Sequence, residues 1–297
     1  MATHDERLWV VVGPTASGKT ALAIELCEAH DGEIVSADSV QVYRHFEIGA
    51  GKPSVEERAR AKHHLIDVIE PNEPMDAARF TQLAELAIAD IRARGKRPIV
   101  CGGTFLWVRA LIHGLVPAPP ADPALRARHQ ARVAEVGRNG LHADLARVDG
   151  EAARRLAPND FVRVSRALEV FELTGVRMSE WQAAHGFKTS RHDARLLGVR
   201  REKSELDQLI LARCRAMLQA GWVAEATRLL QAGYADSRPF NSVGYKQIAL
   251  ALQSEQPLDL ESLELSIFRA TRIFARRQRT WLRDQPIEWL SPGSTKL

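Results

Sequence analysis

Short apolar runs alternate with amphipathic segments along the first 119 residues of the chain. The apolar runs predict buried strands over residues 8–13, 33–39, 63–71 and 97–103. The segments between them have helical spacing of apolar residues and predict helices over residues 19–30, 76–95 and 104–114. Strands that alternate with helices are typical of a parallel sheet covered on both faces, so we expect an α/β fold.

The helix over residues 76–95 has the clearest signals. Asp76 can accept backbone N–H groups at its start, and Gly95 can end it. One face is expected to turn toward the core, and it consists of Phe80, Leu83, Leu86 or Ala87, and Ile91.

The alternation stops at the segment GLVPAPPADP, residues 114–123. Four of these residues are prolines, which can continue neither a helix nor a central strand, so we expect a domain boundary here. The rest of the chain predicts helices over residues 123–137, 141–149, 151–158, 160–175, 203–221, 222–233, 243–253 and 260–283. Short strands are expected over residues 194–200, where the chain can return to the sheet, and 287–290.

The composition is that of an ordinary globular protein, with 45% hydrophobic and 26% charged residues. No run of about 18 apolar residues occurs, so we expect no membrane span, and the first residues lack the pattern of a signal peptide. Cys27, Cys101 and Cys214 are isolated and lack metal-type spacing, which favours a reducing compartment. We therefore expect a cytoplasmic protein.

Charge is distributed unevenly along the chain. Residues 1–119 hold 13 Lys and Arg against 16 Asp and Glu, a net charge of −3. Residues 120–297 hold 28 against 21, a net charge of +7. A positive second part can bind a polyanion, but ordinary scatter explains the same numbers, so charge alone leaves both interpretations open.

Residues 13–20 match the phosphate-binding motif G-x4-G-K-[ST] between a predicted strand and a predicted helix. The motif consists of Gly13, Pro14, Thr15, Ala16, Ser17, Gly18, Lys19 and Thr20. Its glycines allow backbone N–H groups to converge on an anion at the positive end of the following helix. Lys19 can supply a positive charge to a terminal phosphate, and the Thr20 hydroxyl suits Mg²⁺. The motif therefore predicts phosphate binding.

Two carboxylates follow predicted strands. The carboxyl ends of parallel strands face the ligand, so Asp38 and Ser39 are expected beside the bound phosphates. From local sequence alone, the Asp38 carboxylate can hold Mg²⁺, cap a helix or act as a base. Asp67 is the alternative carboxylate for the metal, unless it only makes a hydrogen bond at the end of its strand.

A glycine pair follows the predicted strand over residues 97–103. Gly102 and Gly103 predict a sharp turn at the same edge of the sheet. Thr104 then begins a helix, as an N-cap or as a substrate contact, and the local sequence favours the cap.

The helix over residues 260–283 has an unusual concentration of arginines. They recur mostly at three- and four-residue steps and are Arg269, Arg272, Arg276, Arg277, Arg279 and Arg283. No acidic residue occurs between positions 269 and 283, whereas a merely solvated face normally mixes signs. We interpret this arginine face as a contact for a nucleic-acid backbone, with a solvated surface as the alternative.

The remaining notable side chains are interpreted as structural. His63 and His64 are adjacent, so they point to opposite faces of a strand and cannot form a close ligand pair. Trp9 and Trp107 are expected in the core, and Trp281 is expected to pack under the arginine face.

Together these motifs resemble those of the tRNA dimethylallyltransferases, also called tRNA isopentenyltransferases. The matching segments are GPTASGKT, SADSVQVYRHFEIGAGKP, HHLIDVIEP, CGGTFLWVRALIHGL, NDFVRVSRALEVFELTG, SVGYKQ and TRIFARRQRTWLR. They follow the family's order and span residues 8–283. The resemblance implies transfer of a dimethylallyl group from dimethylallyl diphosphate to N6 of adenine 37, in tRNAs that read codons starting with U, with Mg²⁺ as the metal.

The resemblance also implies the domain organisation. The expected fold is a P-loop NTPase-like α/β core, formed by residues 1–119 and 196–297, with a parallel sheet flanked by helices. Residues 120–195 are expected to form an α-helical insertion that grips the tRNA anticodon stem-loop. The boundary that the prolines predict agrees with this division, and the resemblance suggests a monomer.

Individual roles are carried over by position. Asp38 matches the carboxylate that accepts the proton from adenine N6, and Thr104 lies near the channel where the substrates meet, so both are expected at the catalytic centre. The phosphate-binding loop is expected to hold the diphosphate. The implied tRNA contacts are Asp38, Ser39, Val40, Gln41, Thr104, Arg126, Val162, Arg163, Val164, Ser165, Arg166, Asn241, Ser242, Val243, Gly244, Tyr245, Lys246, Arg276, Arg277, Gln278, Arg279, Thr280, Trp281, Leu282 and Arg283.

Two positions depart from the family's pattern. Trp107 stands where relatives usually carry Tyr, and we expect little change because an aromatic ring is kept. Leu209 stands at the first Arg of an L-x-x-R-I-x-x-R pattern, and Arg213 keeps the second. If the first Arg helps to hold the diphosphate in relatives, another cation must serve here.

The chemistry of the implied reaction suits these residues. The adenine amine is a poor nucleophile because its lone pair is delocalised into the ring, so it needs a base, which Asp38 can supply. The departing diphosphate gains negative charge, which the loop amides, Lys19 and Mg²⁺ at Thr20 can stabilise.

Two other classes of protein use the same loop. One is a nucleoside or small-molecule kinase, and the other is a nucleic-acid-dependent ATPase or a non-catalytic RNA-binding switch. A kinase or an ATPase releases ADP from ATP, whereas a prenyltransferase does not.

Overall fold

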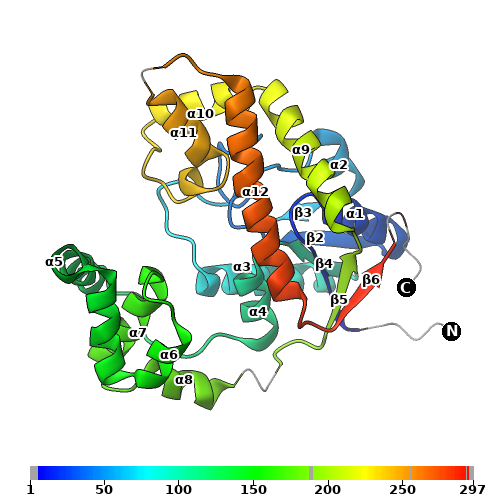
Figure 1. Ribbon diagram of the computed structural model, residues 1–297. Coiled ribbons are helices and arrows are strands. Elements are labelled where there is room, and N and C mark those ends of the chain that lie inside the picture. Colours follow the sequence, from blue (N-terminus) through cyan, green and yellow to red (C-terminus); the bar gives the residue numbers. More distant parts are fainter. Residues whose placement is uncertain (1–5, 187–189, 255, 292, 294–297) are drawn as a thin grey trace. The chain divides into compact units, whose positions relative to one another are not determined.

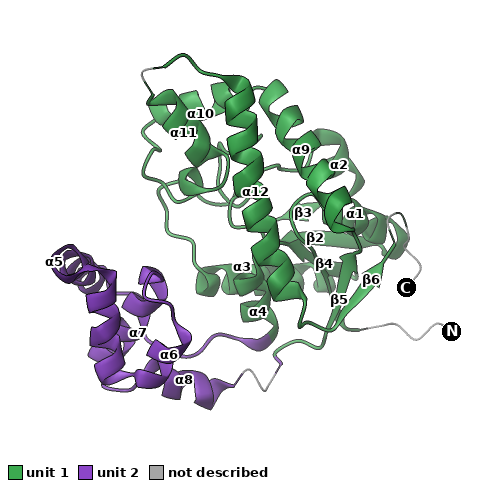
Figure 2. Cartoon of the chain, viewed as in Figure 1, with its two compact units in different colours: residues 1–112, 191–297 green, residues 113–190 purple. Residues whose placement is uncertain are grey.

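The chain folds into two compact units. The computed structural model describes residues 6–186, 190–254, 256–291 and 293. Residues 1–112 and 191–297 make up unit 1, and residues 113–190 make up unit 2 (Figure 2). The breaks fall a few residues before the expected boundaries at 119/120 and 195/196, so the proline-rich segment lies inside unit 2.

A six-stranded parallel sheet forms the centre of unit 1 (Figure 1). Its strands are β1 (Leu8–Val12), β2 (Gly32–Ser36), β3 (His63–His64), β4 (Arg97–Gly102), β5 (Ala194–Val199) and β6 (Ile287–Leu290). They lie in the order β3-β2-β4-β1-β5-β6, and each neighbouring pair is parallel. The expected α/β fold is confirmed, including the return of the chain to the sheet at β5.

Helices cover both faces of this sheet. They are α1 (Lys19–His30), α2 (Val55–Arg60), α3 (Ala77–Ala93), α4 (Phe105–His113), α9 (Lys203–Gln219), α10 (Trp222–Gln231), α11 (Tyr245–Leu252) and α12 (Leu260–Leu282). Trp9 and Val11 of β1 share a cluster with α1, whereas Val10 and Val12 pack with residues of α3, α4 and α9 to α12. Because the centre of the sheet is buried on both sides, the central strands β1 and β4 consist largely of continuous apolar runs.

One expectation about local structure is wrong, and one alternative is decided. The strand expected over residues 63–71 is only His63–His64, because Leu65 and Asp67 have φ angles of 62° and 58°, which break an extended strand. In α3, Leu86 is 69% exposed, and the alternative residue, Ala87, packs against the core instead. The Asp76 cap is confirmed, since its side chain accepts the N–H of Arg79.

The described residues of unit 2 form helices joined by loops. These helices are α5 (Pro123–Val148), α6 (Gly150–Arg155), α7 (Phe161–Thr174) and α8 (Met178–His185). The two helices expected over 123–137 and 141–149 join into α5, which is interrupted at Gly137, where φ is 72°. A small core of its own holds the unit together and includes Leu141, Leu145 and Leu168. Among the described residues, no helix is long and apolar enough to cross a membrane.

Candidate active site

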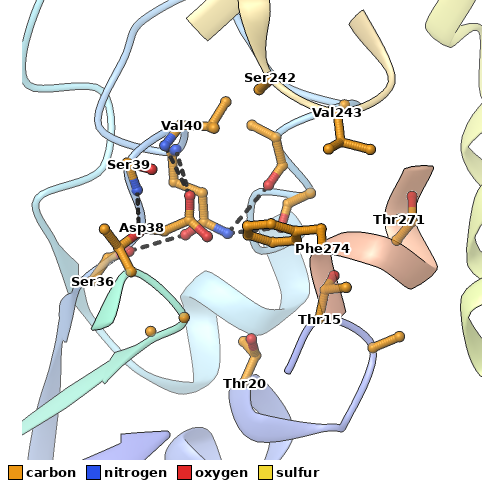
Figure 3. A pocket seen from close by; sticks show the side chains of 18 of the residues that line it. Thr15, Thr20, Ser36, Asp38, Ser39, Val40, Ser242, Val243, Thr271 and Phe274 are labelled. Carbon is orange, nitrogen blue, oxygen red and sulfur yellow. Dashed lines mark hydrogen bonds between the residues drawn. The ribbon is translucent and has the colours of Figure 1, made fainter. Parts of the chain in front are cut away.

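Three loops meet at the carboxyl edge of the sheet, and each follows a neighbouring strand. Residues 13–18 follow β1, residues 37–42 follow β2, and residues 103–104 follow β4. Together with residues of α9 and α12 they line a cavity of about 500 Å³ (Figure 3). The view shows the Asp38 turn and the loop residues Thr15 and Thr20 around the same hollow. This convergence is the place where an open α/β sheet binds its ligand.

The phosphate-binding loop has the backbone geometry that its sequence predicts. Ala16 and Gly18 have left-handed conformations, with φ of 63° and 94°, and α1 begins directly after them. Such turns direct successive N–H groups toward an anion at a helix N-terminus. A Cβ atom at Gly13 would lie 2.5 Å from Ser17 Oγ, so the tight start of the loop requires glycine.

The cavity is electropositive beside this loop. Lys19 and Arg213 both line it, and no residue described in the structure pairs with the Arg213 guanidinium. Burial lowers the pKa of the Lys19 amine because the ammonium loses solvation; the Asp38 carboxylate opposes this fall, and Arg213 adds to it. An anionic ligand would compensate both cations, so this end of the cavity suits a diphosphate.

The departure from the family's pattern at Leu209 lies outside the cavity lining. Leu209 is absent from the residues that line the cavity, whereas Arg213, four residues later on α9, lines it. Of the two positions of the pattern, the one that keeps its arginine therefore faces the cavity.

Asp38 has the geometry for two of the roles that local sequence left open, the cap and the base. Its Oδ1 accepts the N–H groups of Val40 at 2.9 Å and Gln41 at 3.3 Å, so it caps the turn that follows β2. Among the described residues, none hydrogen-bonds to Oδ2, and the side chain lines the cavity. One carboxylate oxygen can therefore fix the turn while the other accepts a proton.

The alternative carboxylate, Asp67, lies elsewhere. Its side chain forms ion pairs with Lys52 and Arg58, and it is absent from the cavity lining. The structure thus brings Asp38, and not Asp67, to the phosphate-binding loop.

Thr104 does not cap its own helix through its side chain, contrary to the interpretation that the local sequence favours. Its Oγ1 accepts the N–H of Ser39 at 3.0 Å, and its backbone N–H donates to the Ala37 carbonyl at 3.2 Å. The approach is close, because a Cβ atom at Gly102 would lie 2.2 Å from the Ala37 oxygen. Thr104 thus holds the Asp38 turn in place and also lines the cavity.

Gln278 of α12 connects the loop after β1 to the loop after β4. The sequence did not predict this connection. Gln278 is 5% exposed, its Oε1 accepts the N–H of Thr15 at 2.8 Å, and its Nε2 donates to the Gly103 carbonyl at 3.0 Å. The resemblance implies a tRNA contact at this position. Both polar groups of the side chain are instead used inside the protein.

Comparison with known proteins decides the family. The family model described as IPP transferase matches residues 41–285 of the chain. The chain belongs to this family. The tRNA dimethylallyltransferase of Sorangium cellulosum (strain So ce56) is 58% identical over 284 residues, which cover 96% of this chain and 90% of that protein. The tRNA dimethylallyltransferase of Anaeromyxobacter dehalogenans (strain 2CP-1) is 51% identical, with 96% and 93% covered.

Solved structures agree with the family. The full-length tRNA isopentenylpyrophosphate transferase from Bacillus halodurans superposes with a TM-score of 0.70 at 35% identity, covering 97% of this chain and 90% of that one. A eukaryotic dimethylallyltransferase acting on tRNA gives a TM-score of 0.81 at 25% identity, covering 96% and 73%. The resemblance found from the motifs is confirmed, as is the expected class of enzyme, a prenyl-transferring transferase.

Several positions that the family pattern marks as tRNA contacts have buried side chains here. They are Val164, Ser165, Tyr245, Gln278 and Leu282. Gly244 is buried as well, and a Cβ atom there would lie 1.9 Å from Trp222. The pattern was carried over in continuous segments, and a helical segment always turns some of its residues toward the core. These side chains do not offer the expected contact in this structure.

Two arginines of unit 2 are also engaged internally. Arg126 and Arg166 both form ion pairs with Glu169, whose side chain is fully buried. Near Arg166 on α7, Val162 is 73% exposed and the Arg163 side chain is 74% exposed. This leaves Val162 and Arg163 as the most accessible residues of the segment over 162–166.

The other expected contacts are accessible. Several of them line the cavity at the carboxyl edge of the sheet, namely residues 38–41, Thr104, Asn241, Ser242 and Val243. The exposed residues are Asn241, Lys246, Arg276, Arg277, Arg279, Thr280 and Arg283. Trp281 is partly buried and stacks on Phe105, with ring centroids 4.2 Å apart, as expected of a residue beneath the arginine face.

The arginine face of α12 is divided. Arg272 forms an ion pair with Asp207 at 3.0 Å, so the N-terminal part is partly neutralised. Toward the C-terminus, a second cavity of about 590 Å³ lies between α12 and the start of α9. It is lined by arginines from both segments, which are Arg200, Arg201, Arg276, Arg279 and Arg283. Arg201 pairs with Glu205 and Arg283 with Asp284, so the arginines of this cavity that have no ion pair with a described residue are Arg200, Arg276 and Arg279.

The donor set in the main cavity fits a Mg²⁺ ion that is shared with a phosphate ligand. Within the described part of the chain, no group of three or more His, Cys, Asp and Glu side chains could hold a metal alone. Mg²⁺ is usually held by one or two protein oxygens together with substrate phosphates and water. The Thr20 hydroxyl and the Asp38 carboxylate both line the cavity and are oxygen ligands of this kind.

Proposed function

We propose that this protein transfers a dimethylallyl group from dimethylallyl diphosphate to N6 of adenine 37 in tRNA. The products would be N6-(dimethylallyl)adenosine and diphosphate. The observation that carries the proposal is that one cavity joins a phosphate-binding loop, Lys19 and Arg213 to Asp38, whose Oδ2 accepts no hydrogen bond from a described residue. Membership of the IPP transferase family and high identity to tRNA dimethylallyltransferases support it.

The donor fits the electropositive end of the cavity. Its diphosphate would lie against the loop amides, Lys19 and Arg213. As the bond between the allylic carbon and the diphosphate oxygen breaks, negative charge grows on the leaving group, and these groups stabilise that charge. Thr20 would hold a Mg²⁺ ion, which supplies further charge stabilisation for the diphosphate.

The acceptor reaches the same cavity from the Asp38 side. The N6 amine attacks the allylic carbon, forms the new carbon–nitrogen bond and loses a proton to Asp38 Oδ2. The adenine must leave the stacked anticodon loop to enter the cavity. The exposed arginines of α12 and the exposed residues of α7 would hold the RNA backbone meanwhile.

We further propose the setting in which the reaction takes place. The acceptors are tRNAs with adenines at positions 36 and 37, which read codons that start with U. The protein acts as a monomer in the cytoplasm, with Mg²⁺ as its metal ion. The unit formed by residues 113–190 is the insertion that grips the anticodon stem-loop.

A transfer assay tests the proposal. The protein is incubated with labelled dimethylallyl diphosphate, Mg²⁺ and unmodified tRNA, and the tRNA is then digested to nucleosides. We expect labelled N6-(dimethylallyl)adenosine, and no release of ADP when ATP replaces the donor. Folded protein that yields no such nucleoside contradicts the proposal, and turnover of ATP to ADP would favour a kinase or an ATPase.

Replacing Arg279 with Ala should weaken tRNA binding and flatten its dependence on salt. Arg279 is exposed and lines the arginine-rich cavity of α12. If it contacts one phosphate, the slope of log affinity against log salt should become shallower by about 0.7–0.9. Binding of tRNA to Arg279→Ala, parent and Arg92→Ala is measured at several salt concentrations. Arg92 is an exposed helical arginine on α3, so equal slopes for the two variants would assign the arginine face to solvent.

A further inference from the structure

We propose that Gln278 is a positioning residue that sets the separation between the donor site and the acceptor site. The inference rests on the proposed prenyl transfer and goes beyond it, because it assigns a role in the chemical step to a side chain whose two polar groups both bind the protein's own backbone. The side chain belongs to α12, which also carries the exposed arginines.

The contacts of Gln278 bridge two loops that are otherwise held by different strands. Thr15 belongs to the phosphate-binding loop after β1, and its N–H donates to Gln278 Oε1 at 2.8 Å. Gly103 belongs to the turn after β4, and its carbonyl accepts from Gln278 Nε2 at 3.0 Å. A buried amide that satisfies one donor and one acceptor in this way has a single orientation, so it fixes both loops at once.

The fit leaves little room for adjustment. A Cβ atom at Gly103 would lie 2.5 Å from Gln278 Nε2 and 3.5 Å from the Gly13 carbonyl oxygen. The glycine turn and the start of the phosphate-binding loop are therefore in close contact around the amide. A change in the length of the side chain at position 278 would alter the distance between them.

The bridge continues to the proposed base. Thr104 follows Gly103 directly, and its Oγ1 accepts the N–H of Ser39, the neighbour of Asp38. From the amide of Gln278, one connection leads to the loop that would hold the diphosphate, and the other leads to the carboxylate that would accept the proton. Displacement of reacting groups by about 1 Å can cost on the order of a hundredfold in rate, so this geometry matters for the chemical step.

Two other features of α12 favour a role in alignment over one in stability alone. Trp281, three residues after Gln278, stacks on Phe105 of α4, so the helix is fixed to the glycine turn at a second point. Arg277 and Arg279 flank Gln278 and are exposed. The helix that would contact the RNA is thus the same one that holds the two loops together.

Three variants test this role. Gln278→Met has similar length and removes both hydrogen bonds. Gln278→Glu keeps the acceptor for Thr15 but can donate to Gly103 only while its carboxyl is protonated. Thr81→Val is the matched control, because Thr81 is buried in α3 and its hydroxyl donates to the Ala77 carbonyl, away from the cavity.

The measurements are the single-turnover rate at saturating donor and tRNA, the KM values, the thermal midpoint of unfolding, and hydrogen exchange of the Thr15 amide. For Gln278→Met we expect a rate at least about tenfold lower, KM values within about threefold of the parent, and faster exchange at Thr15. Thr81→Val should lose stability and keep the parental rate. The rate of Gln278→Glu relative to the parent should rise as the pH falls through the pKa of the new carboxyl, which burial raises above its ordinary value of about 4.3.

Two results would overturn the inference. One is a Gln278→Met rate equal to that of Thr81→Val, and the other is a Gln278→Glu variant with the pH profile of the parent. A parent protein without transfer activity contradicts the proposed function instead. In that case the bridge is tested without catalysis. It would be overturned if Gln278→Met showed the same hydrogen exchange at the Thr15 amide and the same affinity for inorganic diphosphate as the parent.

Discussion

Replacing Asp38 with Asn should lower the rate of prenyl transfer at saturating substrates by about 10²–10⁴-fold, while tRNA binding survives. The asparagine oxygen can still accept the N–H groups of Val40 and Gln41, so the turn after β2 keeps its cap. The amide nitrogen at the other position has no lone pair available for a proton. The substitution thus separates the cap that Oδ1 forms from the proposed role of Oδ2 as the base.

The measurement is a single-turnover transfer assay together with a tRNA binding curve. Asp67→Asn serves as the control, because Asp67 also follows a strand of the sheet but pairs with Lys52 and Arg58 outside the cavity. Asp38→Ala, which removes the cap as well, should be at least as slow as Asp38→Asn. A parental rate for Asp38→Asn would remove Asp38 as the base and leave only its role in the turn.

The parts of this site that sequence predicts are those fixed by short-range geometry. The loop over residues 13–20 lies between a strand and a helix in the sequence and in the structure alike. Asp38 and Thr104 follow strands that the apolar runs predict. Because the carboxyl ends of parallel strands meet at one edge of the sheet, both residues were expected beside the loop. Their positions were predictable because each depends only on a strand and the turn directly after it.

The bridge through Gln278 depends on contacts between distant segments. Gln278 lies 263 residues from Thr15 and 175 residues from Gly103 in the chain. The sequence does carry one signal for it, since Gln278 occupies a position in the buried stripe of α12, between Ala275 and Leu282. A polar residue in an apolar stripe indicates a buried hydrogen bond, although it does not identify the partner.

Glu225 shows the same signal in α10. It lies in the buried stripe with Trp222 and Leu229, and its carboxylate accepts the N–H of Ile48 at 2.8 Å and the hydroxyl of Tyr245. Burial raises the pKa of the Tyr245 phenol, which therefore stays protonated and donates. This explains why a position that the family pattern marks as a tRNA contact instead supports the wall of the cavity.

Other features had no sequence signal. The short β3 results from left-handed backbone conformations at Leu65 and Asp67, which residues other than glycine rarely adopt. The pairing of Arg126 and Arg166 with Glu169 depends on how α5 packs against α7. Charge counts along the chain cannot distinguish such internal pairs from arginines that face a partner.

Replacing Lys19 with Met should lower kcat/KM for the donor by about 10²–10³-fold, the loss typical of removing one group that stabilises the charge of a transition state. Met has similar length and no charge, so the start of α1 keeps its packing. Lys203→Met is the matched control, because Lys203 is also the first residue of a helix and carries the same charge, but it pairs with Asp207 outside the cavity.

The binding of inorganic diphosphate gives a second test of Lys19, since its pH dependence has a defined sign. Burial lowers the pKa of the Lys19 amine, and a cation with a lowered pKa loses its charge as the pH rises. The affinity of the parent for diphosphate should therefore fall as the pH rises, and this fall should begin at lower pH than an ordinary lysine would allow. Lys203→Met should keep this fall, whereas Lys19→Met should bind weakly throughout and lack it. If calorimetric titration gave the two variants the same affinity and the same pH profile, Lys19 would not be the cation that holds the leaving group, and Arg213 together with the loop amides would have to stabilise that charge.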